Sequence, residues 1–355
     1  MNIALVSPVM VPIPPPKYGG IELIVDELAQ GLAHRGHQVT VFCAGGSTLS
    51  GNNITVVESS PYPLFENPGE NREWEERQLL SVLKRQHEFD IIHLHYEPAV
   101  CCFDRDGETI DIARRFSVPT VFTFHNTTSI PVYEAYYRQY TDVKNQHFVF
   151  ISKNQLKPLA FLPNATVIYN GLPIQQFPLG KEKEDVLFFL GRITPAKGIL
   201  DAITVSELSN IPLNIAARID DIDREFYDRD VKHRIDGNHI RYIGEIGFSE
   251  KVEYLRKARC LLFPIQWEEP FGLVMVEALA CGTPVVAFRR GSVPEIIQNG
   301  VNGFVINTVE EMVEAVKNVD TLSPRVCRAS AEDRFDVGRM VDEYERFFLA
   351  IAQKK

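Results

Sequence analysis

Short apolar segments alternate with amphipathic helical segments along the whole chain, and this alternation most constrains the fold. The first strand is expected at residues 2–7, and residues 21–35 are expected to form a helix that ends at Gly36. Further strands of this half are expected at residues 38–44, 91–94, 120–124 and 148–151. Strand–helix–strand alternation with apolar runs predicts an α/β fold with a parallel, doubly wound sheet.

The same pattern restarts in the second half of the chain. Its strands are expected at residues 186–190, 213–217, 240–243, 260–264, 284–287 and 304–306. Residues 172–185 are rich in proline and charge and lack periodicity, so we expect a linker there. The sequence therefore predicts two Rossmann-like domains, at residues 1–175 and 182–335, that face each other across a cleft. We expect the ligand in this cleft, at the carboxyl ends of the strands.

Composition excludes several classes of protein. A chain of 355 residues is long enough for two full cores. The formal net charge of −10 argues against broad nucleic-acid or anionic-membrane binding, because those partners need a cationic surface. Six cysteines without a C-x-x-C pair fit a reducing compartment, and no apolar run reaches membrane length. We expect a cytoplasmic protein, and the mixed charges of residues 72–87 give no support for membrane association.

Two glutamates, Glu269 and Glu277, bracket the first turns of an expected helix. Pro270 disfavours helical geometry at the residue before it, so Glu269 is expected in the loop ahead of the helix. Residues 273–280 then read as helix, with Gly282 and Pro284 just beyond its end. The N–H groups at the helix start form an anion site, contributed by Gly272, Leu273 and Val274. An anion between two carboxylates suggests a sugar nucleotide.

Two cations follow the first strand of the second half. Arg192 comes directly after the strand with Gly191, and Lys197 precedes Gly198 at the start of the next helix, expected from about Ala196. Arginine can grip a phosphate through two hydrogen bonds, and lysine adds a compact positive charge. Basic residues in such a loop are common, but together with the two glutamates they favour a phosphate clamp.

Paired glycines, Gly19 and Gly20, occupy the first strand–helix loop of the first half. Glycines permit close backbone approach to a ligand, and the helix start offers N–H donors. The loop lacks the G-x-G-x-x-G spacing of a dinucleotide fold, which argues against a dehydrogenase.

Three histidines lie at or near strand ends. His125 follows the strand at residues 120–124, a position that favours function over a structural hydrogen bond. For His93 and His95 the two interpretations are about equal. We expect these two to alternate across their strand, so that they cannot both face one cleft.

No metal site is expected. Three D-x-D triplets occur, at residues 104–106, 221–223 and 228–230, but such triplets are frequent in an acidic chain. Two of them hold an arginine between the carboxylates, which competes with a cation, and hard cations need several convergent oxygens. We therefore expect no metal and no cofactor.

These motifs together resemble the family 4 glycosyltransferases, which have the GT-B fold. The residues that carry the resemblance follow one order along the chain: Gly19-Gly20-Ile21-Glu22, His125, Asn170-Gly171, Gly191-Arg192, Lys197-Gly198, Glu269-Pro270-Phe271-Gly272, Glu277, Cys281-Gly282-Thr283-Pro284-Val285, Gly291-Ser292-Val293-Pro294-Glu295 and Gly300. The match spans nearly the full length. The glutamate pair with the preceding arginine and lysine is its most specific part.

The resemblance implies a retaining, metal-independent transfer of a sugar from a nucleotide donor, with a UDP-sugar favoured. Its implied catalytic residues are His125, Glu269, Arg192 and Lys197. The implied diphosphate contacts are Gly19, Gly20, Arg192, Lys197, Gly272, Leu273 and Val274. The donor sugar would meet Glu269, Phe271, Gly272 and His125, and the ribose and base would meet Glu277, Arg218, Ile243 and Gly244. The first domain would carry the acceptor, with Tyr18, His95, Tyr96 and Asn126 as candidates.

The resemblance also implies that the last helix, at about residues 337–353, crosses back to the first domain. The chain departs from the family at Arg218, where many relatives have a glycine-rich turn, so Arg218 either reaches the nucleotide or covers the sheet end. The identity of the acceptor stays open between a small molecule, a glycan and a lipid-linked acceptor. Two alternatives stay open: a GT-B-like isomerase or epimerase acting on the sugar nucleotide, and a non-catalytic two-lobed binding protein.

Overall fold

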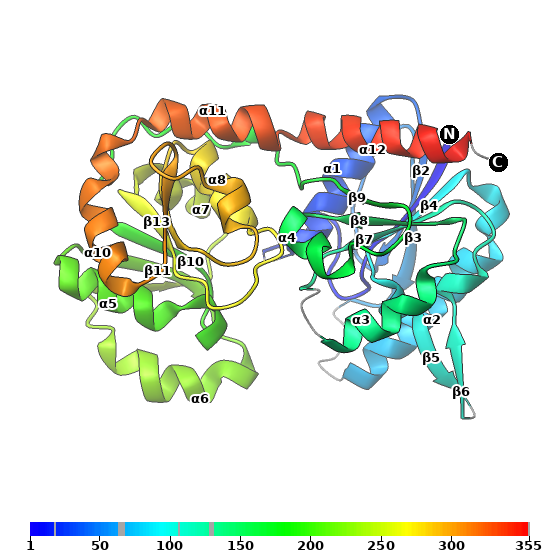
Figure 1. Cartoon of the computed structure of the whole chain (residues 1–355), viewed down its shortest axis with the longest axis horizontal. Helices are drawn as coiled ribbons and strands as arrows, with labels where there is room; N and C mark the ends of the chain where they lie inside the picture. Colours follow the sequence, from blue (N-terminus) through cyan, green and yellow to red (C-terminus); the bar gives the residue numbers. More distant parts are fainter. Residues whose placement is uncertain (18, 63–67, 106, 128–130, 354–355) are drawn as a thin grey trace. The chain divides into compact units, whose positions relative to one another are not determined.

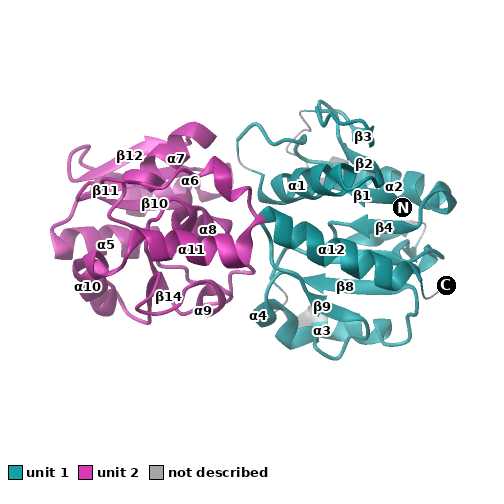
Figure 2. Ribbon diagram, turned by 90° about the horizontal axis from the view of Figure 1, so that it is seen from above, with its two compact units in different colours: residues 1–171, 337–355 teal, residues 172–336 magenta. Residues whose placement is uncertain are grey.

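The computed structural model describes residues 1–17, 19–62, 68–105, 107–127 and 131–353 (Figure 1). The chain divides into two compact units. Unit 1 consists of residues 1–171 and 337–355, and unit 2 consists of residues 172–336 (Figure 2). The chain has the GT-B architecture, in which each unit is a Rossmann-like parallel sheet covered by helices.

Unit 1 is built on a seven-stranded parallel sheet. Its strands are β1 (Asn2–Val6), β2 (Gln38–Ala44), β3 (Ile54–Ser60), β4 (Ile91–Leu94), β7 (Thr120–Phe124), β8 (Gln146–Phe150) and β9 (Ala165–Val167). The spatial order is β3-β2-β1-β4-β7-β8-β9, so the chain reverses direction across the sheet between β1 and β4. Ligands of open α/β sheets bind at such a reversal, at the carboxyl ends of the strands.

The central strands of this sheet agree with the expected ones, whereas the edge strands β3 and β9 were not predicted. Both edge strands consist largely of partly exposed residues. A strand at an edge has one neighbour and less burial, so it lacks the continuous apolar run that marks a central strand. A short antiparallel hairpin, β5 (Cys102–Arg105) and β6 (Glu108–Asp111), was also not predicted.

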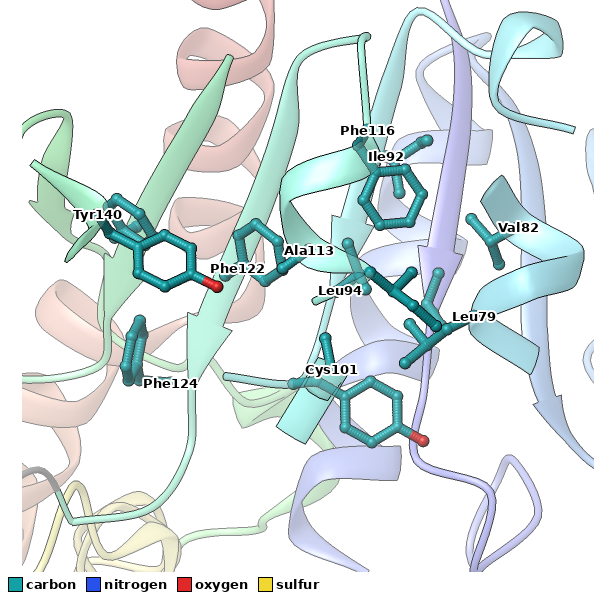
Figure 3. Packing of buried hydrophobic residues seen from close by; sticks show 14 of the residues in the cluster. Leu79, Val82, Ile92, Leu94, Cys101, Ala113, Phe116, Phe122, Phe124 and Tyr140 are labelled. Carbon is teal, nitrogen blue, oxygen red and sulfur yellow. The ribbon is translucent and has the colours of Figure 1, made fainter. Parts of the chain in front are cut away.

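Helices cover the sheet of unit 1 and complete its core. They are α1 (Gly20–His34), α2 (Pro68–Lys84), α3 (Pro131–Tyr137), α4 (Lys153–Leu156) and α12 (Val337–Ala352). In the core, Leu79 and Val82 of α2 pack with Ile92 and Leu94 of β4, and the cluster continues through Phe122 and Phe124 of β7 (Figure 3). This apolar layer fixes β4 and β7, whose carboxyl ends carry the histidines.

The last helix, α12, belongs to unit 1 and packs against α1. Tyr344 and Phe348 of α12 are almost fully buried. Arg35, just after α1, forms an ion pair with Glu345 at 2.7 Å, and His37 Nε2 lies 2.8 Å from the other carboxylate oxygen of Glu345. Apolar burial and these polar contacts together anchor the helix.

Unit 2 is built on a six-stranded parallel sheet. Its strands are β10 (Leu187–Arg192), β11 (Leu213–Arg218), β12 (Ile240–Gly244), β13 (Cys260–Phe263), β14 (Val285–Phe288) and β15 (Gly303–Ile306). The order is β12-β11-β10-β13-β14-β15, so this sheet reverses between β10 and β13. The helices of unit 2 are α5 (Ile199–Ser209), α6 (Arg224–Phe226), α7 (Phe248–Lys257), α8 (Leu273–Ala280), α9 (Val293–Ile296), α10 (Val309–Asn318) and α11 (Pro324–Phe335).

The stretch expected to be a linker, residues 172–185, is instead packed into unit 2. Leu172, Ile174 and Phe177 are buried, and the Leu172 N–H donates to the Phe335 carbonyl at 2.9 Å. The proline and charge content correctly predicted an irregular backbone for this stretch. An irregular segment can still bury its apolar side chains, so it need not be a free linker.

Five of the six cysteines are buried free thiols, and Cys102 is partly buried. No helix in the described part of the chain is both long enough and apolar enough to cross a membrane.

Replacing Phe348 by alanine should strongly destabilise the protein, because Phe348 is fully buried beside Tyr344 and His93. Loss of a buried phenylalanine costs about 3–5 kcal/mol of unfolding free energy. Leu349→Ala is the matched control, since Leu349 on the same helix is 40% exposed and should cost about 0.5 kcal/mol. Urea unfolding followed by circular dichroism measures both variants. Equal midpoints for the two would contradict the packing of α12.

Candidate active site

The candidate site of unit 2 lies where its sheet reverses, at the carboxyl ends of β10 and β13. Arg192 is the last residue of β10, and the segment after β13 leads through Glu269 to the start of α8. Strand order alone therefore brings Arg192 and Glu269 to the same edge of the sheet.

Glu269 lies in the loop before α8, as expected, and is 9% exposed. Its Oε2 accepts two hydrogen bonds, from Lys197 Nζ at 2.7 Å and from Trp267 Nε1 at 2.9 Å. The Lys197 ammonium also lies 5.2 Å from the centre of the Trp267 ring. A carboxylate so far removed from water needs such partners, and the pair neutralises both charges.

Lys197 is positioned by a short turn, residues Pro195–Lys197, that follows β10. The Thr194 side chain accepts from the Lys197 N–H at the start of this turn. The next residue, Gly198, has a left-handed backbone with φ 72° and lies so close to β13 that a Cβ would stand 1.9 Å from the Pro264 carbonyl oxygen. Only glycine allows this approach, which brings Lys197 beside Glu269.

Helix α8 begins at Leu273, the residue that the sequence predicts, after a left-handed Gly272 with φ 81°. The N–H groups of Gly272, Leu273 and Val274 make no hydrogen bond within the described part of the chain. Three free N–H groups at a helix start attract an anion. Phe271, which precedes them, is buried against Phe335, and its carbonyl accepts from the Ser292 hydroxyl at 2.7 Å.

Glu277 lies one turn into α8 and is 3% exposed. Its Oε1 pairs with Lys251 Nζ of α7 at 2.5 Å. Its Oε2 is buried and has no hydrogen-bond partner among the described residues. A buried carboxylate oxygen without a donor is costly, so this atom is suited to receive a hydroxyl from a ligand.

Arg192 and Arg218 stand side by side at the ends of neighbouring strands and share Asp220. Arg192 Nη1 lies 3.3 Å from Asp220 Oδ2, and Arg218 Nε lies 2.6 Å from Asp220 Oδ1. Burial alone would raise the pKa of Asp220, but hydrogen bonds and charges from the two arginines outweigh burial and lower the pKa. The shared carboxylate keeps both guanidinium groups at this edge of the sheet.

The loop that carries Glu269 is held from behind by Gly291. This glycine has φ 53°, and a Cβ there would stand 2.3 Å from both the backbone N and O of Glu269. The Gly291 N–H donates to Glu268 Oε2, and the Ser292 N–H donates to the Glu269 carbonyl, both at 2.9 Å.

Ile243 and Gly244 end β12, and Gly244 has a left-handed backbone with open space around it. The open glycine leaves the backbone at this strand end accessible. Among the described residues, no group of three or more histidine, cysteine, aspartate or glutamate side chains is arranged to hold a metal ion.

In unit 1, Gly19 precedes α1 and Gly20 begins it. A Cβ on Gly19 would stand 2.5 Å from the Pro15 side chain, so this loop requires glycine for space. Glu22, in the first turn, is 5% exposed, and burial raises its pKa to about 7 despite a hydrogen bond from its own backbone. Tyr18 lies outside the described residues.

His125 and Asn126 follow β7, and their loop is held on two sides. Glu97 Oε1 accepts from the Asn126 N–H at 3.1 Å and from the Asn126 side chain at 2.9 Å. Gln155 of α4 donates to the carbonyls of Phe124 and Asn126. The backbone on either side of His125 is therefore fixed.

His93 and His95 lie together, and the prediction that they could not face the same side was wrong. Their ring centres are 4.2 Å apart, because strand residues two positions apart point to the same face. His95 Nδ1 in turn lies 3.0 Å from His125 Nε2. Tyr96, an acceptor candidate, is buried in the core of unit 1, where its hydroxyl donates to Gln78 at 3.2 Å.

Known protein families match both units. The family described as "Glycosyltransferase Family 4" matches residues 18–176, and the family described as "Glycosyl transferases group 1" matches residues 173–325. The chain is a family 4, group 1 glycosyltransferase.

Individual relatives of this glycosyltransferase are distant. A phosphatidyl-myo-inositol mannosyltransferase of Mycobacterium leprae is 25% identical over 386 aligned residues, covering 99% of this chain and 97% of that protein. An uncharacterized glycosyltransferase of Methanocaldococcus jannaschii is 26% identical, but the match covers 64% of this chain and 66% of that protein, just under two thirds of its length. The solved structure of the Anabaena protein HepE in complex with UDP and glucose has a TM-score of 0.73 at 18% identity, over 99% of this chain and all of that one.

Several residues of this glycosyltransferase that shape the site were not predicted. They are Trp267, Lys251, Asp220, Glu97 and Gln155. Trp267 stands two residues before Glu269, so its place in the motif was a signal. Lys251 and Gln155 reach their partners from distant helices, and a single sequence does not reveal such pairs.

Gly291→Ala should disturb the glutamate loop of this glycosyltransferase more than Gly300→Ala. Both glycines are left-handed, so each substitution costs about 1–2 kcal/mol of stability. Only a methyl group at Gly291 collides with the Glu269 backbone, whereas Gly300 has nothing within 4 Å. Thermal unfolding and nucleotide binding, measured on both variants, should show the larger loss for Gly291→Ala. Equal losses would contradict the contact with Glu269.

Proposed function

We propose that this glycosyltransferase moves a sugar from a UDP-sugar to an acceptor hydroxyl with retention of configuration and without a metal. The observation that carries the proposal is the pairing of Glu269 with Lys197 beside the free N–H groups at the start of α8. This arrangement combines an anion site, a lysine cation and a carboxylate that can accept hydrogen bonds from hydroxyl groups.

The donor diphosphate is proposed to lie at the start of α8. There the N–H groups of Gly272, Leu273 and Val274, with Arg192 and Lys197, would take its negative charge. When the donor binds, the Lys197 ammonium is proposed to exchange Glu269 for a phosphate oxygen as its partner. As Lys197 turns toward the phosphate, the Glu269 carboxylate becomes available to the hydroxyls of the donor sugar.

The ribose is proposed to lie against Glu277. The buried Oε2 without a partner would accept a ribose hydroxyl, while Lys251 continues to balance the charge through Oε1. Arg218, Ile243 and Gly244 are proposed to lie beside the base. The UDP preference is supported by the similarly folded HepE, which was solved in complex with UDP and glucose.

Cleavage of the glycosyl–phosphate bond places negative charge on the departing diphosphate. Prepositioned cations and a helix N-terminus would stabilise that charge electrostatically, which supports a reaction without metal. We assign Glu269 to the hydroxyls of the donor sugar and not to nucleophilic attack. We therefore propose a front-face reaction in which the leaving phosphate takes the proton of the acceptor hydroxyl. The roles that the resemblance implies for His125, Gly19 and Gly20 stay predictions.

Arg192→Ala and Lys197→Ala should each lower kcat about a hundredfold, since a single electrostatic donor is worth about 3 kcal/mol of the barrier. Lys317→Ala, an exposed lysine of α10 in the same unit, is the control and should leave transfer unchanged. Sugar transfer is measured as nucleotide released per acceptor glycosylated. Full turnover in both site variants would show that Arg192 and Lys197 do not form a phosphate clamp. Donor consumption without any acceptor would favour the isomerase instead.

Substitutions of the two glutamates should have different effects on UDP binding and on sugar transfer. Glu269→Gln should impair sugar transfer while binding of free UDP persists, because UDP lacks the sugar that Glu269 would hold. Glu277→Gln should weaken the binding of UDP itself, because UDP retains the ribose that Glu277 would hold. Calorimetric titration measures the affinity of each variant for UDP. A panel of UDP-, GDP- and ADP-sugars, tested for thermal stabilisation of the protein, measures the base preference. Equal loss of UDP binding in the two variants would reject this division.

A further inference from the structure

Three histidines of unit 1 form a connected stack at the carboxyl ends of β4 and β7. The ring centres of His93 and His95 are 4.2 Å apart, and those of His95 and His125 are 5.2 Å apart. We propose that His95 is a positioning residue that holds His125 in the tautomer with its proton on Nδ1. His125 would then present a hydrogen-bond donor, and not an acceptor, to a ligand.

All three rings are neutral at physiological pH. Burial lowers the pKa of His125 to about 3, and burial followed by the charge of His125 lowers the pKa of His93 to about 3. Burial, with smaller effects of the other two rings, also holds the pKa of His95 well below its usual value. A neutral imidazole has one N–H and one nitrogen lone pair, so each ring exists as one of two tautomers that differ in which nitrogen carries the proton.

The environment of His95 decides this choice. Its Nδ1 lies 3.0 Å from His125 Nε2, whereas its Nε2 is buried without a partner among the described residues. A proton on Nε2 would bury an N–H group with no acceptor, and such orphaned donors are rare in proteins. The proton of His95 therefore belongs on Nδ1, from which it donates to His125 Nε2.

The same hydrogen bond fixes His125. Its Nε2 receives the proton of His95 and must supply a lone pair, so the proton of His125 lies on Nδ1. As a residue, His125 is partly exposed. Its remaining polar atom is thus an N–H donor, which can bind a hydroxyl, carbonyl or phosphate oxygen but cannot take a proton from one.

His93 supports the stack from the other side. Its Nε2 lies 2.7 Å from the Thr123 hydroxyl, and that hydroxyl lies 3.1 Å from the Tyr344 hydroxyl of α12. His93 Nδ1 is buried without a partner among the described residues, so by the same reasoning its proton lies on Nε2 and is donated to Thr123. The final helix thus holds the first ring of the stack.

The consequence for catalysis rests on the glycosyltransferase function proposed above, but the tautomer does not. If His125 contacts the reacting sugar, an Nδ1–H donor would bind a sugar oxygen and orient the ring. Two variants separate the chemical role of His95 from its bulk. His95→Leu removes the donor, and His95→Asn places an amide N–H near the position of Nδ1.

The test is nitrogen NMR of the full chain with ¹⁵N-labelled histidine, in which His125 is assigned by loss of its signals in His125→Gln. The wild type should show His125 protonated on Nδ1 and bare on Nε2. His95→Leu should move the proton to Nε2, whereas His95→Asn should retain the wild-type pattern. His87→Gln, at an exposed position, is the control and should leave the His125 signals unchanged.

The kinetic counterpart is a fall in kcat for His95→Leu of roughly tenfold to a hundredfold, as expected for a misoriented catalytic group, with recovery in His95→Asn. Protonation of His125 on Nε2 in the wild type would overturn the proposal even if the variants did not fold. An unchanged tautomer in folded His95→Leu would overturn it as well. Failure to transfer any sugar would count against the proposed function while the tautomer result stands.

Discussion

The ion pair between Lys197 and Glu269 is the interaction on which the site of unit 2 depends. Both side chains are largely removed from water, so each charge would be costly without the other. The surrounding chain is shaped to make the pair possible. Gly198 lets the lysine turn approach β13, Gly291 supports the glutamate loop, and the Trp267 N–H shares the carboxylate.

Sheet topology explains why this pair forms where it does. In unit 2 the chain runs outward from β10 on one side and then returns to β13 on the other, so the connections that leave the carboxyl ends of these two neighbouring strands diverge to opposite sides. The arginines at the ends of β10 and β11, with the start of α8, add positive charge to this edge. Unit 1 repeats the principle with a reversal between β1 and β4, and β4 and β7 end in the histidine stack.

Much of this architecture follows from the sequence because strong local signals coincide with buried structure. The bounds of α8 were predicted to the residue, since Gly272 and the Cys281-Gly282 turn mark its ends. The edge strands β3 and β9 were missed because partly exposed strands lack an apolar run. The prediction that His93 and His95 face opposite sides was wrong, because strand residues two positions apart point to the same face. The packing of residues 172–185, and the partners Lys251 and Gln155, depend on contacts between distant segments, which a single sequence does not contain.

One nucleotide-sugar site built around Glu269 and Glu277 is the core of the proposed function. A crystal structure of the protein with UDP or a UDP-sugar is the decisive experiment. We expect the diphosphate at the N–H groups of Gly272, Leu273 and Val274, with Lys197 turned from Glu269 toward phosphate. We also expect a ribose hydroxyl on the Glu277 Oε2 atom that has no partner among the described residues. A nucleotide bound elsewhere, with the Lys197–Glu269 pair intact and Glu277 untouched, would contradict it.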